Sequence, residues 1–549
     1  MTPQMFEPTR IDIPDRHYDK WASCGFVLLI FSAYLLRFGY GFGFSDQDEF
    51  LPLIMHWQDA ELFARDWFVM EQASSFGVRT IFSRALYLLS LAVPLKAIVT
   101  ILHFSTFAAV STAIFRIANK LYRNRLTAGL AIFMVVLLTS RWNPGGNDLF
   151  HSMLVPSSMS WALALWSFER VLHKRYLMAG ALSGAAMLIH PLVGLQVGAV
   201  IAVSIFFTEA PRKRALTGFL LPFLIVATPL IVVLAGWESY EPENSTRFSA
   251  EFTLTQLRAP HHYLPSAFTV SSFIKLAIIS VLGFVILWTE RLPLVASRRF
   301  WSHQDGRARR FLLTTSILLL FVLLCAYAMT AIWPVLGVTR LQPFNLSVLL
   351  RIMVVIALSG VVSGLIPLRI GRRITKEICK SSFPMAAGLV ALLVVIGATQ
   401  SDTLKNRIFP SDASKNELYD WIQSNTQQDA VFAIPPSMSG FQVGSRRAQY
   451  VSFKSYPYEV SASEEWLRRL VTIAPVNDLR PGGVALQARL DEAYAEHSPG
   501  GWKDILEKEE IDFIVRERTD QPDGWSIIDP AWCSSSWCVY WAGRILLTP

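Results

Sequence analysis

The sequence predicts a polytopic α-helical membrane protein of about eleven spans, followed by a small C-terminal α/β domain. The first observation is composition, because the 549 residues are 52% hydrophobic and only 17% charged, whereas soluble chains carry about 25% charged residues. The second is that the long apolar runs lie within residues 1–400, while residues 401–549 carry 15 Lys/Arg and 21 Asp/Glu. We therefore expect an N-terminal segment at 1–21, a membrane module at 22–400 and a soluble domain at 401–549.

Eleven apolar segments are candidate spans, because a helix needs about 20 apolar residues to cross the hydrocarbon core. They are 22–43, 94–118, 126–141, 156–172, 176–190, 192–208, 215–236, 271–289, 311–332, 346–366 and 383–400. The first apolar stretch has no small-residue cleavage site, which predicts a retained anchor rather than a signal peptide. The segments 176–190 and 192–208 are short and joined by His190 and Pro191, so a tight pair of half-depth helices is one interpretation.

Positive charge alternates between the loops, with Lys and Arg clustered before the first span and after every second span that follows. The positive-inside rule then predicts a multi-pass protein of the cell membrane, inner or plasma, with a cytoplasmic N-terminus and an extracytoplasmic C-terminal domain. The outer segments are 44–93, 142–155, about 237–270, 333–345 and 401–549. The net charge of +8 therefore reflects topology and contact with membrane lipids, and no nucleic-acid partner is expected.

An acidic sequence, Ser45-Asp46-Gln47-Asp48-Glu49-Phe50, opens the first outer segment directly after the first span. Carboxylates at a span end are costly unless they stay in water, pair with a cation or bind a metal ion. Apolar surroundings raise the pKa of a carboxyl group, and such a group can act as a general base. We expect Asp46, Asp48 and Glu49 to be catalytic or to hold a divalent cation, Mg or Mn, although a solvated helix cap is the alternative. Asp66, later in this segment, is expected to bind substrate, assist the base or help to hold the cation. The rest of the segment predicts one or two juxtamembrane helices.

Basic residues of the other outer segments are candidates for binding substrate. Arg258, His261 and His262 lie close together in the third segment, and Arg340 lies in the fourth. Arginine suits a pair of phosphate oxygens, and adjacent histidines bind phosphate or metal or relay a proton. A polar loop and an interfacial arginine are the alternatives. His151 and His190 complete the set at this face, although His190 is better explained as a buried structural residue. Asn147 and Asp148 are weaker candidates.

The C-terminal domain shows alternating patterns that predict helices at 416–425, 463–473, 484–496 and 501–509 and strands at 430–434, 450–453, 511–515 and 538–541. No P-loop, dinucleotide fingerprint or nucleophile elbow is present. Cys533 and Cys538 are expected to form a disulfide if the domain lies on an oxidising side of the membrane, the alternative being two free thiols. Arg446, Arg447 and Lys454 could face the membrane module, but they are interpreted as solvated charges.

The order of one span, the motif Asp46-Gln47-Asp48-Glu49, juxtamembrane helices, further spans and an outer domain resembles the GT-C superfamily of membrane glycosyltransferases. The tail, with Leu418-Tyr419-Asp420-Trp421-Ile422, Pro435-Pro436 and Gly440-Phe441, is similar to tails of uncharacterised bacterial proteins of this type. The resemblance implies inverting transfer of a hexose or pentose from a polyprenyl-phosphate donor to an acceptor glycan, lipid or protein. Asp46 and Asp48 match the catalytic acid of the superfamily, and basic outer residues would hold the donor phosphate.

Two other classes of function remain as alternatives. A glycan polymerase or ligase without the GT-C fold would use outer Arg and His residues rather than the acidic motif. A transporter or assembly scaffold for cell-envelope glycans is disfavoured, because transporters place ionisable residues within their spans and the spans here have almost none. The tail contains no Trp-Trp-Asp motif, which argues against the oligosaccharyltransferase branch and protein N-glycosylation.

Overall fold

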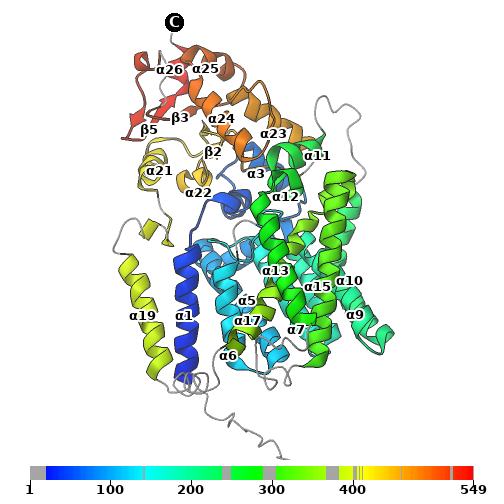
Figure 1. Ribbon diagram of the computed structural model, residues 1–549. Coiled ribbons are helices and arrows are strands. Elements are labelled where there is room, and N and C mark those ends of the chain that lie inside the picture. The colour runs from blue at the N-terminus through cyan, green and yellow to red at the C-terminus, as the bar shows by residue number, and fades with distance from the viewer. Residues whose placement is uncertain are drawn as a thin grey trace, which may run out of the picture.

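The computed structural model confirms a helical membrane module joined to a C-terminal domain with a small sheet (Figure 1). It describes residues 20–139, 143–237, 249–288, 305–365, 382–399, 405–406, 408–410, 412–458, 460–519 and 524–547. The C-terminal domain lies at one end of the bundle, against the acidic segment and the short helices of the third outer segment.

Each of the eleven predicted spans contains a helix. These are α1 (Lys20–Phe38), α5 (Leu95–Tyr122), α6 (Arg125–Leu138), α7 (Pro156–Leu172), α8 (Tyr176–Ile189), α9 (Pro191–Thr208), α10 (Arg212–Trp237), α13 (Val270–Trp288), α15 (Gly306–Tyr327), α17 (Leu346–Leu365) and α19 (Ser382–Ala398). Five helical stretches among the described residues are long and apolar enough to cross a membrane. They are Leu95–Tyr122, Pro191–Thr208, Arg212–Leu234, Gly306–Ile332 and Pro343–Ser363, so the count of eleven spans stays a prediction.

Local sequence signals set the ends of these helices. The first helix ends at Phe38 rather than at the predicted 43, because Gly39 takes a left-handed φ of 71°. Asn124 caps α6 by accepting a hydrogen bond from the backbone N–H of Thr127 at 3.1 Å. His190 caps α9 through its ring Nδ1, 3.4 Å from the Val193 nitrogen. The 14 residues of α8 make a helix of about 21 Å, shorter than the hydrocarbon core, whereas the 18 of α9 reach about 27 Å.

The membrane helices pack around one apolar core, and α1 lies beside α19 although the two are far apart in sequence (Figure 1). Helix α7 carries one fully buried charge, Glu169. Its carboxylate pairs with Arg116 and Arg170, each at 2.6 Å. A buried charge is tolerated when it is paired in this way, so Glu169 belongs to the structural interior.

The acidic motif forms a short 3₁₀ helix, η1 (Ser45–Glu49), and three helices follow it where one or two were expected. They are α2 (Leu51–Gln58), α3 (Trp67–Ser74) and α4 (Thr80–Ser90). Helix α4 is amphipathic, with Phe82 and Leu86 buried and Leu88 and Leu89 exposed. Such a helix is suited to the membrane interface.

The C-terminal domain is a five-stranded sheet with flanking helices, in the strand order β2-β1-β3-β5-β4. The strands are β1 (Val431–Ala433), β2 (Ala448–Gln449), β3 (Phe513–Glu517), β4 (Trp532–Cys533) and β5 (Trp537–Trp541). The helices are α21 (Ala413–Asn425), α22 (Phe441–Ser445), α23 (Val460–Ile473), α24 (Val484–Glu496), α25 (Pro499–Leu506) and α26 (Ala542–Leu546). The first three strands in this order are parallel, and β3, β5 and β4 are antiparallel. The predicted disulfide between Cys533 and Cys538 is confirmed and joins β4 to β5.

The strand predicted at 450–453 is wrong. Pairing with β1 ends after a hydrogen bond from the Tyr450 N–H to the Phe432 carbonyl, and the chain then leaves the sheet. Phe453 and Tyr456 are buried against Trp466 of α23. Tyr450, Val451 and Phe453, the residues that predicted a strand, are buried by packing outside the sheet instead. The consequence is that residues 450–458 run along the membrane module, and the prediction that Lys454 is a solvated charge is wrong as well.

Candidate active site

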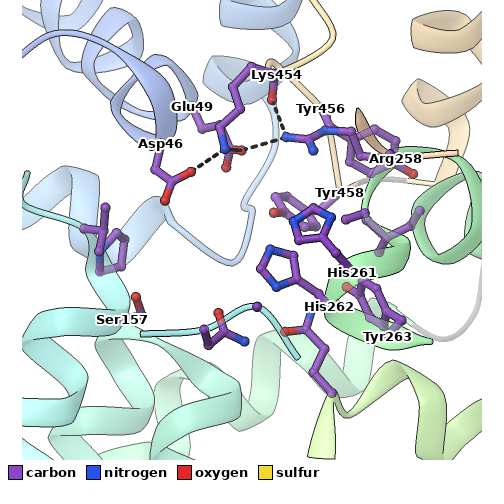
Figure 2. Close-up of a pocket in the computed structure, with 18 of the residues that line it drawn as sticks. Asp46, Glu49, Ser157, Arg258, His261, His262, Tyr263, Lys454, Tyr456 and Tyr458 are labelled. Atoms are coloured by element: carbon purple, nitrogen blue, oxygen red, sulfur yellow. Dashed lines mark hydrogen bonds and ion pairs between the residues drawn. The ribbon is translucent and has the colours of Figure 1, made fainter. Parts of the chain in front are cut away.

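A pocket of about 270 Å³ lies where the outer segments meet the C-terminal domain (Figure 2). All five segments that were predicted to lie outside contribute to its wall. Its polar lining includes Asp46, Glu49 and Arg79 of the first, Asn147 and His151 of the second, Arg258, His261 and His262 of the third, Gln342 of the fourth and Lys454, Tyr456 and Tyr458 of the last. Five segments distant in sequence thus form one chemical site.

Asp46 is the acidic residue that faces this pocket and retains partial exposure, with 39% of its side chain accessible. Ser45 adopts a left-handed φ of 56°, and its N–H donates to the Ser439 hydroxyl at 2.5 Å, so the turn that presents Asp46 is held by the C-terminal domain. The carboxylate forms an ion pair with Lys454. Burial alone would raise the pKa of Asp46, but Lys454, with His151 and Arg79, outweighs burial and holds that pKa well below its usual range.

Glu49 also lines the pocket, but its carboxylate is buried and shared among several cations. It pairs with Arg79, accepts a hydrogen bond from Arg258 Nη2 at 3.3 Å and lies 4.0 Å from Lys454 Nζ. A buried carboxylate between two guanidinium groups is stabilised as an anion. Glu49 therefore positions the basic groups, and this arrangement leaves its oxygens poorly placed to accept a proton from a substrate.

Asp48 and Asp66 lie outside the pocket lining and anchor the C-terminal domain. Asp48 accepts hydrogen bonds from the Ser439 hydroxyl at 2.5 Å and from the Gly440 N–H at 3.1 Å. Burial raises its pKa to about 7, although these hydrogen bonds oppose the increase. Asp66 caps α3 and accepts from Gln442 Nε2 at 2.7 Å and the Gln449 N–H at 2.9 Å. Burial likewise raises the pKa of Asp66, to about 6.

The histidine pair and Arg258 face Asp46 across the pocket (Figure 2). The His262 ring lies 4.1 Å from that of His261, and its Nδ1 is 2.8 Å from the Gly145 carbonyl oxygen, to which it donates when that nitrogen carries the proton. Burial lowers the pKa of His261 to about 3 and that of His262 to about 4, so both rings are neutral at pH 7. Arg258 is buried, and among the described residues its Nε has no hydrogen-bond partner. Buried polar groups usually have a hydrogen-bond partner, so this donor is an unsatisfied group in the pocket wall.

The structure places Arg340 away from the pocket lining. Its guanidinium is 55% exposed and pairs with Glu251 at 2.7 Å. Gln342, two residues later, lines the pocket instead. His151 and His190 both line it, as does Asn147 of the two weaker candidates, whereas Asp148 is outside the lining.

Sequence reasoning missed Arg79, Lys454, Tyr456 and Tyr458 as pocket residues. The Nη2 of Arg79 donates to the Tyr458 hydroxyl at 3.1 Å. A usable signal was the density of aromatic residues around Lys454, because aromatic side chains close to a lone cation are typical of a binding surface rather than of a solvated loop.

The pocket does not present a ready set of ligands for a divalent cation. Among the residues that the structure describes, no group of three or more His, Cys, Asp or Glu side chains is placed to hold a metal ion. Asp46 faces an ammonium group, and Glu49 faces two guanidinium groups. A divalent cation therefore remains a prediction from the sequence.

Comparison with known proteins identifies similar folds. A family model described as a domain of unknown function, DUF6798, matches residues 413–473, and no match was found among curated proteins. The chain is similar to the oligosaccharyltransferase AglB of Archaeoglobus fulgidus, solved with an inhibitory peptide and a dolichol-phosphate, at 10% identity and a TM-score of 0.47, over 91% of this chain and 69% of that one. The apo form of the Archaeoglobus fulgidus oligosaccharyltransferase gives 11% identity and a TM-score of 0.48, over 91% and 70%.

ArnT from Cupriavidus metallidurans in the apo state gives 10% identity and a TM-score of 0.45, over 96% of this chain and 98% of that one. The similarity concerns the arrangement of elements, and the function proposed below rests on the pocket.

Proposed function

We propose that this protein is a membrane glycosyltransferase that transfers a sugar from a polyprenyl-phosphate donor to an acceptor hydroxyl at the extracytoplasmic face. The observation that carries the proposal is the placement of Asp46. Its carboxylate faces a pocket that also contains Lys454, Arg258 and Arg79, directly after the first apolar helix. A base and a group of cations are the two elements that displacement of a phosphate from a sugar requires.

In the proposed reaction, the acceptor oxygen attacks the anomeric carbon from the side opposite the phosphate, so the configuration inverts. Its proton passes to the Asp46 carboxylate. The bond between the anomeric carbon and the phosphate oxygen breaks, and polyprenyl phosphate leaves with the bonding electrons. Arg258 stabilises the negative charge on the departing phosphate, and the neutral His261 ring can donate a hydrogen bond to it, while the single N–H of His262 is directed at the Gly145 carbonyl oxygen.

The pocket is proposed to open at the extracytoplasmic side. The loop charges support this orientation, as does the disulfide between Cys533 and Cys538, because disulfides persist in oxidising compartments. The amphipathic α4 beside the pocket would rest on the outer leaflet, where a lipid-linked donor presents its phosphate.

The test is incubation of the purified protein with a panel of polyprenyl-phosphate sugars and measurement of the lipid phosphate released. We expect release with at least one donor, a loss of at least about a thousandfold in Asp46→Ala, and retained turnover in Asp48→Ala. Full activity of Asp46→Ala would favour a polymerase or ligase that relies on Arg and His. Movement of a solute without any covalent product would favour a transporter.

A further inference from the structure

The ion pair between Asp46 and Lys454 joins the proposed base to a residue of the C-terminal domain more than four hundred positions later. Both side chains are partly exposed, with 39% of Asp46 and 29% of Lys454 accessible. Both line the pocket, so this exposure is toward the space where a ligand would bind (Figure 2). A ligand can therefore reach either partner.

This pairing has a chemical cost for a base. A carboxylate that faces an ammonium group is reliably ionised, but it accepts a proton poorly because the same charge that keeps it ionised opposes protonation. General-base catalysis improves as the pKa of the base approaches the working pH. The Asp46 carboxylate as it stands in this pocket, with its pKa held low by Lys454, is therefore a resting form.

Lys454 is the pocket cation best suited to change partner. Arg258 is buried and is held by Glu49 and by the carbonyl oxygen of Lys454, and Arg79 is held by Glu49 and Tyr458. The Lys454 ammonium is held by Asp46 and lies at 4.0 Å from Glu49. Its side chain is flexible, and an ammonium is a point charge with three donors and no fixed geometry.

We infer that Lys454 is a positioning residue that exchanges Asp46 for the donor phosphate, so that binding of the donor frees the base. This rests on the proposed function. The exchange couples the two substrates, because Asp46 gains basicity only when a phosphate occupies the pocket. Charged and titratable groups from several neighbouring elements surround the Asp46–Lys454 pair. They are Asp48, Glu49, Arg79, His151, Arg258, His261 and His262.

Binding of a simple lipid phosphate tests the exchange without knowledge of the sugar. Dodecyl phosphate is titrated by calorimetry into the full chain in neutral-lipid nanodiscs, with inorganic phosphate as a second arm. Lys454→Met should weaken dodecyl phosphate about tenfold, as expected for a lost charge-assisted hydrogen bond. Asp46→Asn should strengthen it several-fold, because the internal competitor for Lys454 is gone. The double variant should bind like Lys454→Met alone.

Two controls separate the loss of a phosphate contact in Lys454→Met from a change in folding or net charge. Lys454→Arg should recover part of the affinity, and Lys508→Met, which removes an exposed cation of the same domain, should bind like wild type. Weaker binding in Asp46→Asn, or additive effects in the double variant, would overturn the exchange. If inorganic phosphate bound as tightly as dodecyl phosphate, the exchange would not depend on a lipid-linked donor, and the proposal would be overturned.

The pH dependence of turnover is the second readout, and a purely structural role would not move it. Removal of the ammonium raises the pKa of Asp46, and the base works only when deprotonated. The acid limb of kcat/KM should therefore move to higher pH in Lys454→Met. If Lys454→Met still turns over and the acid limb of its kcat/KM profile does not move, the exchange is wrong and the proposed function stands. If the wild-type protein shows no turnover with any donor, the proposed function itself is wrong.

Discussion

Asp46 and Asp48 are two positions apart and perform different tasks, because the 3₁₀ turn of η1 points them to different neighbours. Asp46 faces the pocket and pairs with Lys454, whose side chain is flexible. Asp48 faces the backbone N–H of Gly440 and the Ser439 hydroxyl, which bind it firmly. The environment rather than the residue type assigns the role of each carboxylate.

The first prediction separates these roles by stability. Asp48→Ala leaves the Gly440 N–H and the Ser439 hydroxyl without their acceptor in a buried place, and we expect a loss of about 2 kcal/mol. Asp46→Ala removes a partly exposed ion pair and should change stability by less than about 1 kcal/mol. Thermal unfolding of both variants in detergent measures the difference. Equal losses would mean that Asp46 is also a structural anchor.

The second prediction concerns pH. Burial raises the pKa of Asp48 in the folded chain to about 7, above the ordinary value of about 3.9. The folded state therefore holds this proton more tightly, so the stabilisation is complete below about pH 4 and is lost as pH rises through about 7. The melting temperature of wild type should fall across this window, and the fall should be shallower in Asp48→Asn, which cannot ionise. Asp66, raised to about 6, contributes in the same direction in both proteins.

Several individual residues of the candidate site could be predicted from the sequence. The acidic motif and the pair His261-His262 are compact signals, and the structure brings Asp46 and both histidines into one pocket. The sequence could not show which of Asp46 and Asp48 faces the pocket, because Asp48 is held away from it by Ser439 and Gly440 of a distant domain. The pairing of Lys454 with Asp46 was beyond prediction for the same reason, since a lysine in a loop shows its partner only after folding.

At the scale of elements, the pocket depends on loops that approach one another closely. Gly146, with a left-handed φ of 63°, lies against the histidine pair of α12 (Pro260–Tyr263). A Cβ atom at this position would stand 3.0 Å from His261 Cδ2 and 3.2 Å from His262 Nδ1. The second outer segment therefore packs directly on the residues that face the proposed leaving group.

The third prediction uses this contact. Gly146→Ala combines backbone strain of about 1 kcal/mol with pressure on both rings, and a displacement of either ring should lower kcat/KM about tenfold while the protein stays folded. Kinetics with a donor that the panel of polyprenyl-phosphate sugars identifies, together with a melting curve, measure both quantities. Gly337→Ala is a matched control, because no atom lies within 4 Å of a Cβ built there. Wild-type kinetics in Gly146→Ala would show that the histidine pair is not placed by this contact.

For the molecule as a whole, apolar length and loop charge predicted the helices well, because the membrane imposes both on any chain. Every predicted span contains a helix, with ends shifted by a few residues at features such as Gly39. The sheet was predicted less completely, since β2 and β4 are two residues each and are defined by pairing with β1 and β5 rather than by a pattern of their own. The junction between the domains was beyond prediction, because it is made of single contacts such as Asp66 with Gln442.

The last prediction concerns orientation, which determines the substrates that can reach the pocket. Alkaline phosphatase, which becomes active only where its disulfides form, is fused after Pro549 in one protein and after Thr208, between α9 and α10, in another. We expect activity from the first fusion and none from the second, because the loop charges place these points on opposite sides. In the same membranes, Cys533 and Cys538 should resist alkylation until a reductant is added. An inactive fusion at Pro549 with freely alkylated Cys533 would place the pocket on the cytoplasmic side, where the proposed donor would have to be one that faces the cytoplasm.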